Sequence, residues 1–206
     1  MTEHNGDIKP TIKAYKGKSS SGIGGLDLAL DGGFAPGTSV LVIGSATSGI
    51  DRFARQFWGI SSESRRYFMI DGFVERGMTE GKALSPETIF NDFGGVGFVI
   101  DSLSTLIVKY GIESVLNGVI SCRTVIHTSK DHAFYLLYKG LHDRYDEILL
   151  LRICDVVIEL HEEVHGNELL RALEVKKITG MQPPGRVLPF LVTEKGIELS
   201  TTSRVV

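Results

Sequence analysis

The chain has 206 residues, of which 42% are hydrophobic and 23% are charged, and its formal net charge is −3. This length and composition predict one globular domain with a single core, and the slightly negative charge excludes the overall basic surface that general binding to nucleic acid or anionic membranes requires. No run reaches the roughly 18 apolar residues that span a bilayer, and the polar N-terminus lacks the apolar segment of a signal peptide, so we expect a cytoplasmic protein.

The chain divides into a short polar arm and one domain. Residues 1–18 carry four lysines and few large apolar side chains, which predicts a flexible N-terminal arm. Residues 19–206 contain no repeat or low-complexity tract and are predicted to form one domain. Within it, Leu26, Leu28 and Leu30 fit a short helical turn, and Pro36 with the following glycine marks a turn before the first strand.

A loop of small residues then joins an apolar strand, residues 40–44, to an amphipathic helix. The helix is predicted from Ile50, Phe53, Ala54, Phe57 and Trp58, whose spacing places them on one face. The loop holds, in order, Gly44, Ser45, Ala46, Thr47, Ser48, Gly49, Ile50 and Asp51. Its two glycines have the spacing of the phosphate-binding motif G-x-x-x-x-G-K-[ST], but Ile50 replaces the lysine and Asp51 replaces the Ser/Thr.

The rest of the chain alternates strands with helices and closes with antiparallel strands. We predict strands at residues 67–70, 98–101, 124–128 and 156–160. One helix is predicted to begin at Ser85, a second at Leu103, and a third to run from about Asp131 to Arg152. This alternation predicts an α/β fold with a mostly parallel sheet covered on both faces. Residues 169–178, 187–193 and 197–200 predict an antiparallel extension at one edge.

Several segments, in the same order, resemble one family. They are SGIGGLD (21–27), DGGFAPGTSV (31–40), FVIDSLS (98–104), CDVVIEL (154–160), RALEVKKITG (171–180) and PFLVTEKGIE (189–198). Together they resemble the RecA-like ATPases that include the circadian-clock protein KaiC and the archaeal recombinase RadA, and are most similar to short, single-domain archaeal KaiC-like proteins. The resemblance implies a three-layer RecA-like P-loop NTPase fold from about residue 20 to residue 199.

The resemblance also implies where a nucleotide site would lie. In this family ATP binds at the P-loop between neighbouring subunits of a ring or filament, and a carboxylate at the end of the third strand, here Asp101, holds magnesium through water. Residues 44–51 and Asp101 therefore form a vestigial nucleotide site. Asp71 matches the first acid of the family's catalytic pair, but Gly72 stands at the base position, for which Glu75 is a weak substitute. Lys177 matches a lysine that neighbouring subunits supply, whereas Thr179 replaces the accompanying arginine.

These replacements predict a pseudo-ATPase with no catalytic residues. Phosphoryl transfer depends on cations and a positioned water, and a carboxylate at Asp51 would repel a phosphate about 4 Å away by roughly 4 kcal/mol at an effective dielectric of 20. We expect Asp51 to supply negative charge at the helix N-terminus in place of a phosphate, and Thr47 and Ser48 to cap the loop amides. No cofactor is expected, and ATP with magnesium would bind weakly.

The predicted function is regulation or signal transduction through protein partners, including self-association as a dimer or ring. One alternative is an ATP- and magnesium-binding switch, or a slow ATPase, in which Asp51 and Asp101 hold the metal. A DNA-recombination paralogue is a further alternative, but the segment after Thr128 has few basic residues before Arg144 and does not favour nucleic acid binding.

Three further features have structural interpretations. Residues 161–165 match the zinc-protease motif H-E-x-x-H, but that motif requires a helix. Here it follows a strand and precedes a Gly-Asn turn, so we predict an exposed loop in which residues four apart lie roughly 13 Å apart. His127, Thr128 and Ser129 end the predicted fourth strand, where the family senses nucleotide state, and we interpret them as polar strand-end residues. Cys122 and Cys154 are predicted to be buried free thiols.

Overall fold

The computed structural model describes residues 17–92, 94 and 97–200. Most of the predicted N-terminal arm lies outside these residues, as do residues 201–206. Of the arm, the structure describes Gly17 and Lys18, and the ammonium of Lys18 donates to the carbonyl oxygens of Leu30 and Asp31, both at 2.9 Å. Among the described residues, no helix is long and apolar enough to cross a membrane.

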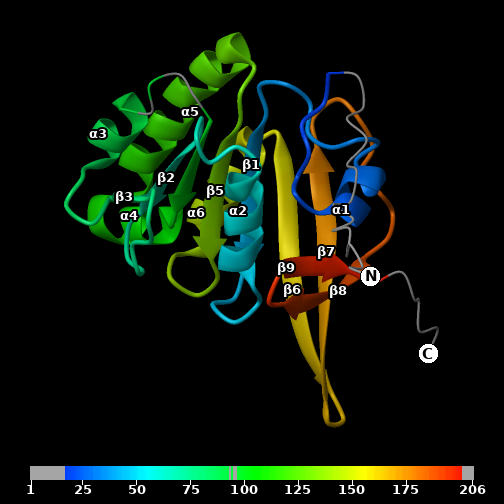
Figure 1. Cartoon of the computed structure of the whole chain (residues 1–206). Coiled ribbons are helices and arrows are strands. Elements are labelled where there is room, and N and C mark those ends of the chain that lie inside the picture. The colour runs from blue at the N-terminus through cyan, green and yellow to red at the C-terminus, as the bar shows by residue number, and fades with distance from the viewer. Residues whose placement is uncertain (1–16, 93, 95–96, 201–206) are drawn as a thin grey trace, which may run out of the picture.

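The described strands form one nine-stranded sheet in the order β3-β2-β4-β5-β1-β6-β7-β8-β9 (Figure 1). Its parallel part comprises β1 (Ser39–Gly44), β2 (Arg66–Met69), β3 (Thr79–Glu80), β4 (Phe98–Asp101), β5 (Ala133–Tyr138) and the first half of β6 (Val156–His165). Strands β7 (Glu168–Ile178), β8 (Leu188–Thr193) and β9 (Gly196–Leu199) are antiparallel. The predicted parallel sheet with an antiparallel C-terminal extension is confirmed.

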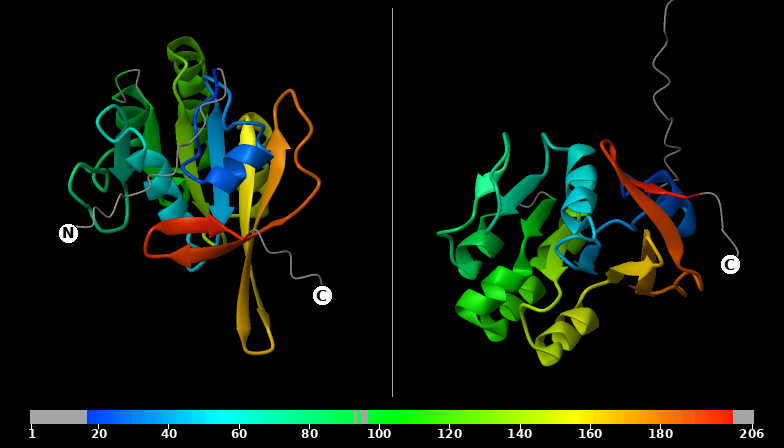
Figure 2. Two further views of the ribbon diagram at one scale, coloured as in Figure 1. Left: turned by 45° about the vertical axis from the view of Figure 1, so that its right-hand side comes forward. Right: turned by 90° about the horizontal axis from the view of Figure 1, so that it is seen from below.

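Helices cover both faces of this sheet, as Figure 2 shows from below. On one face lie α1 (Gly24–Ala29) and α2 (Ile50–Gly59). On the other lie α3 (Pro86–Asn91), α4 (Leu103–Tyr110), α5 (Ile112–Ser129) and α6 (Arg144–Ile153). The side chains of successive β1 residues lie on opposite faces of the sheet. Val40 and Val42 pack with α1 and α2, and Leu41 and Ile43 pack with the helices α3 to α6 on the other face.

The predicted amphipathic helix is confirmed as α2. Its residues Ile50, Phe53, Ala54 and Phe57 are fully buried, and the Phe57 ring stacks on Phe134 of β5 with centroids 4.5 Å apart. The predicted start of α3 is also confirmed, because the Ser85 side chain accepts a hydrogen bond from the Thr88 amide. Local sequence signals therefore place these two helices correctly.

Two predicted elements are wrong. Residues 124–128, predicted as a strand, are the last turns of α5, and the helix predicted from Asp131 to Arg152 is instead β5 followed by α6. The apolar residues of β5 also fit a helical spacing, but β5 lies between β1 and β4 and is buried on both sides, so sheet pairing decides its conformation. In consequence His127, Thr128 and Ser129 end a helix, not a strand.

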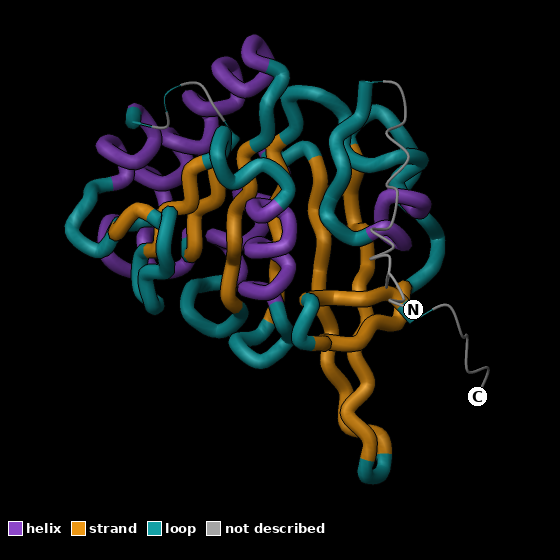
Figure 3. Tube along the Cα trace, in the orientation of Figure 1, coloured by secondary structure: helices purple, strands orange, loops and turns teal. Residues whose placement is uncertain are grey.

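Strands β6 and β7 continue past the parallel sheet as a long hairpin (Figures 1 and 3). Residues 161–165, predicted to be a loop, are the distal part of β6, and their register with β7 runs from His161 opposite Ala172 to His165 opposite Glu168. They are extended and not helical, which confirms that they cannot act as a zinc-protease helix. The second hairpin, β8–β9, is fixed to α2 by Gln56, whose side chain bonds both the amide and the carbonyl of Ile197.

Candidate functional site

The small-residue loop, residues 44–51, has the predicted strand–loop–helix layout. Strand β1 ends at Gly44 and α2 begins at Ile50, with Gly49 as the N-cap residue at φ 85°, a left-handed conformation that glycine adopts without strain. The loop closes on itself, because the amide and hydroxyl of the buried Ser48 both donate to the Ser45 carbonyl, at 3.2 and 2.8 Å. The predicted capping by Thr47 and Ser48 is wrong: the Ser45 hydroxyl accepts from the Thr47 amide at 3.3 Å.

The two replacements in the motif have different surroundings, one in the core and one in a partly exposed ion pair. Ile50, at the lysine position, is fully buried in the core between α2 and the sheet. Asp51, at the Ser/Thr position, lies in the first turn of α2 and pairs with Arg55 one turn later, at 3.4 Å. The same Arg55 also pairs with Glu75 at 3.3 Å. The loop thus has an apolar anchor and an ion pair where the motif has its two reactive side chains.

The carboxylate that contacts the loop comes from Glu162 on β6. Its Oε2 accepts hydrogen bonds from the hydroxyls of Ser45, at 2.6 Å, and Thr47, at 2.7 Å. Its Oε1 accepts from Arg171 Nε at 3.0 Å, and Arg171 also donates to the Thr47 carbonyl at 3.4 Å. The Glu162 side chain is only 13% exposed. Through these hydrogen bonds, an anion from this chain already lies against the loop.

Hydrogen bonding keeps this carboxylate ionised. Burial acts to raise the pKa of Glu162, but hydrogen bonds from Ser45 and Thr47 and the charge and hydrogen bond of Arg171 outweigh it and hold the pKa below its ordinary value. Reasoning from the sequence assigned Glu162 to an exposed loop and missed this contact. The available signal was the alternation along β6, which places Glu162 on the same face as the buried Ile158 and Leu160.

Asp101 ends β4, as predicted for the magnesium-binding carboxylate. It is 3% exposed, and each of its oxygens accepts a hydrogen bond from a phenol, from Tyr67 at 2.7 Å and from Tyr138 at 3.1 Å. Burial raises the pKa of Asp101 to about 6, against the lowering effect of these two hydrogen bonds, and the charges of Asp71 and Asp51 raise it further. A metal shared by Asp51 and Asp101 stays a prediction.

The other two predicted residues, Asp71 and Lys177, lie at opposite ends of the parallel strands. Asp71 lies near Asp101 and accepts hydrogen bonds from Ser102, at 3.1 Å, and from Thr105. Lys177 lies opposite Val157, near the start of β6 and away from the loop. Its ammonium donates to three carbonyls at the C-terminus of α6, those of Leu151, Arg152 and Cys154, at 2.6–3.0 Å. Within its own chain Lys177 therefore caps a helix.

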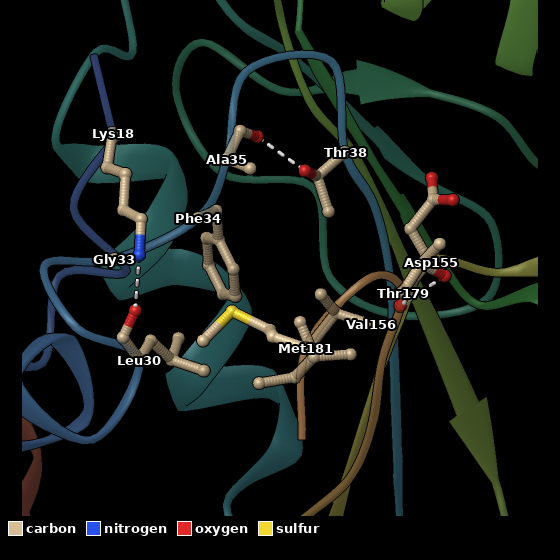
Figure 4. A pocket seen from close by; sticks show the side chains of 11 residues that line it. Lys18, Leu30, Gly33, Phe34, Ala35, Thr38, Asp155, Val156, Thr179 and Met181 are labelled. Atoms are coloured by element: carbon tan, nitrogen blue, oxygen red, sulfur yellow. Dashed lines mark hydrogen bonds between the residues drawn. The ribbon is translucent and has the colours of Figure 1, made fainter. Parts of the chain in front are cut away.

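A cavity of about 60 Å³ lies near the start of β6, away from the small-residue loop. It is drawn in Figure 4, where the Phe34 ring and the Met181 side chain lie next to one another. Asp155 lies at its wall. The carboxylate oxygens of Asp155 accept hydrogen bonds from the Ser39 amide and hydroxyl and from Arg123, so they are already bonded within the protein. Small-molecule sites commonly have volumes of about 300–1,000 Å³, so this cavity is too small for a nucleotide.

The predicted buried free thiols, Cys122 and Cys154, are confirmed.

Comparison with known proteins identifies the fold. No protein-family model matches the sequence, and no curated protein matches it. Among solved structures, the KaiC-like protein PH0186 from the hyperthermophilic archaeon Pyrococcus horikoshii OT3 matches with a TM-score of 0.70 and 19% sequence identity, over 89% of this chain and 98% of that chain. At this identity the match shows the fold alone: the chain has the same mixed α/β fold as that KaiC-like protein, with a mostly parallel sheet and an antiparallel C-terminal part. The resemblance inferred from the sequence is confirmed at that level.

Proposed function

We propose that this chain is a non-catalytic KaiC-like domain that acts through protein contacts in regulation or signal transduction. The observation that carries the proposal is the Glu162 carboxylate, which lies against the hydroxyls of the small-residue loop and pairs with Arg171. In this fold the loop is the place for a phosphate. Here the hydroxyls of Ser45 and Thr47, and the guanidinium of Arg171, are already bound to an acid of the same chain.

Electrostatics supports the same conclusion. A phosphate entering the loop would meet the charges of Glu162 and Asp51, and Arg171 would have to leave Glu162 to neutralise it. One like-charge contact at about 4 Å costs roughly 4 kcal/mol at an effective dielectric of 20, which corresponds to about a thousandfold in affinity. Ile50 supplies no compensating charge, because it is buried in the core.

We expect the proposed protein contacts to involve large apolar side chains that are exposed. Phe73, in the loop after β2, is 80% exposed, and Val164, near the tip of the long hairpin, is 72% exposed. Leu191 on β8 is 63% exposed. Association with a protein partner, or with a second copy of the chain, would bury these side chains.

Calorimetric titration with MgATP, followed by a phosphate-release assay, tests the proposal. We expect no binding in the micromolar range and no turnover by the native chain. Micromolar binding with turnover that Asp101→Ala abolishes would defeat the proposal and favour a slow ATPase. Micromolar binding without turnover would favour a nucleotide-dependent switch, and mass measurement with and without MgATP would then show whether assembly responds to it.

A further inference from the structure

The long hairpin brings together three side chains that are able to bind a metal ion. Glu159 and His161 are two residues apart on β6 and therefore share a face, and Glu174 on β7 lies directly opposite Glu159. One ligand atom from each of the three lies within 4.8 Å of the other two. We call these three residues the histidine cluster. It uses the first histidine of the H-E-x-x-H segment, with partners that the motif does not contain.

The imidazole of His161 lies between the two carboxylates. Its Nε2 is 3.1 Å from Glu174 Oε2, and its Nδ1 is 3.8 Å from Glu159 Oε1. The Glu159 side chain is 13% exposed, while those of His161 and Glu174 are 38% and 36% exposed. The cluster is thus held on two paired strands, and solvent reaches it from one side.

Cations already occupy this position. The Lys176 ammonium lies 2.8 Å from Glu159 and 3.8 Å from Glu174, and Lys139 also bonds Glu159. Burial acts to raise the pKa of Glu159, but the two lysines outweigh it and hold the pKa below its ordinary value. Lys176, which contacts both glutamates, is the competitor that an incoming metal ion must displace.

We propose that Glu159, His161 and Glu174 form a binding site for a divalent transition-metal ion, with Zn²⁺ as the best match. Imidazole nitrogen and carboxylate oxygen are ligands that zinc accepts, and three protein ligands leave the fourth tetrahedral position for water. Calcium and magnesium prefer oxygen ligands alone. The ion takes the place of the Lys176 ammonium and joins β6 to β7 at the base of the projecting part of the hairpin.

This site is independent of the proposed function. The side chains of the histidine cluster lie on one face of β6, and Glu162, which contacts the small-residue loop, lies on the other. A failure of either proposal therefore leaves the other intact.

Calorimetric titration of the full chain with Zn²⁺ in metal-free buffer tests the site. We expect one zinc per chain, and at least tenfold weaker binding in His161→Ala, since even outer-shell changes cost about tenfold to a hundredfold. His165→Ala is the matched control, because His165 belongs to the same strand and motif but lies outside the cluster. Lys176→Met removes the competitor and should bind zinc more tightly than the native chain.

Circular dichroism checks that each variant is folded, and Glu174→Gln serves as a second ligand variant. Zinc binding that is weakened in His161→Ala and Glu174→Gln and kept in His165→Ala supports the site. No binding by the native chain overturns it. Equal losses in His161→Ala and His165→Ala also overturn it, because they would indicate general binding to exposed histidines.

Discussion

The carboxylate of Glu162 lies 2.6 Å from the hydroxyl of Ser45, although the two residues are 117 positions apart in the chain. This contact joins the long hairpin to the loop between β1 and α2, and it places a negative charge against the hydroxyls of that loop. Arg171, opposite Glu162 on β7, balances that charge. The loop, the acid and the arginine therefore form one unit whose parts can be tested separately.

Glu162→Gln removes the charge while keeping the shape of the side chain. We expect a loss of about 1–2 kcal/mol in the free energy of unfolding, because a charge-assisted network becomes neutral and Arg171 loses its partner. Urea denaturation measures this. The same variant should gain a phosphate-dependent rise in Tm, since ligands that bind the native state stabilise it. Glu163→Gln, exposed on the other face of β6, should do neither, and similar behaviour in both variants would contradict the role of Glu162.

Ile50→Lys restores the lysine of the motif but places an ammonium in the core. Since Ile50 is fully buried, we expect a loss of about 3 kcal/mol or more, as is typical for an unpaired buried charge. The conservative control Ile50→Val should lose only about 1 kcal/mol. Urea denaturation of both variants gives the comparison. An Ile50→Lys chain as stable as the native one would show that the loop has room for the lysine.

Asp101→Asn isolates the effect of the pH on the buried carboxyl. The pKa of Asp101 is raised to about 6 in the fold, compared with about 3.9 in an unfolded chain. Between pH 4 and 6 the folded state binds more protons than the unfolded state, so this residue lowers stability as the pH rises and its full cost applies above pH 6. The stability of Asp101→Asn relative to the native chain should therefore increase between pH 4 and 6, by up to about 3 kcal/mol, and then level off. A difference that does not change with pH would contradict the shift.

Lys177→Met removes the cation that caps α6. We expect a loss of about 1–2 kcal/mol, because three terminal carbonyls lose a charged donor. The loss should not depend on protein concentration, since the contact lies within one chain. Lys195→Met, in the turn of the β8–β9 hairpin, is the control and should be neutral. A loss that appears only at concentrations where the chains associate would instead assign Lys177 to a neighbouring subunit.

The sequence predicted the elements whose signals are local. The layout of β1, the small-residue loop and α2 follows from an apolar run, two glycines and a helical spacing that lie within about twenty positions. The conformation of β5 was not predictable in this way. The side chains of β5 fit both helical and strand spacings, and its position between β1 and β4 selects the strand. For α5 the spacing of Val115, Val119, Cys122 and Ile126 gave a usable signal.

The site was predictable only in part. Ile50 and Asp51 could be read directly from the motif, and Asp101 ends its strand as expected. The alternation along β6 indicates the face on which Glu162 lies, but the partners of Glu162 and Lys177 depend on the register between β6 and β7, which no local pattern contains. The resemblance to KaiC-like proteins indicated the position of the loop but not the acid that this chain brings to it.

The long hairpin carries contacts on both of its faces, Glu162 with the loop on one and His161 with its two glutamates on the other. It cannot bend toward either face without changing the distances on both. A protein that bound the exposed Val164 near the tip would therefore contact the same hairpin that holds both groups of residues. Both groups lie at or beyond Glu159, where the pairing of β6 with β1 ends.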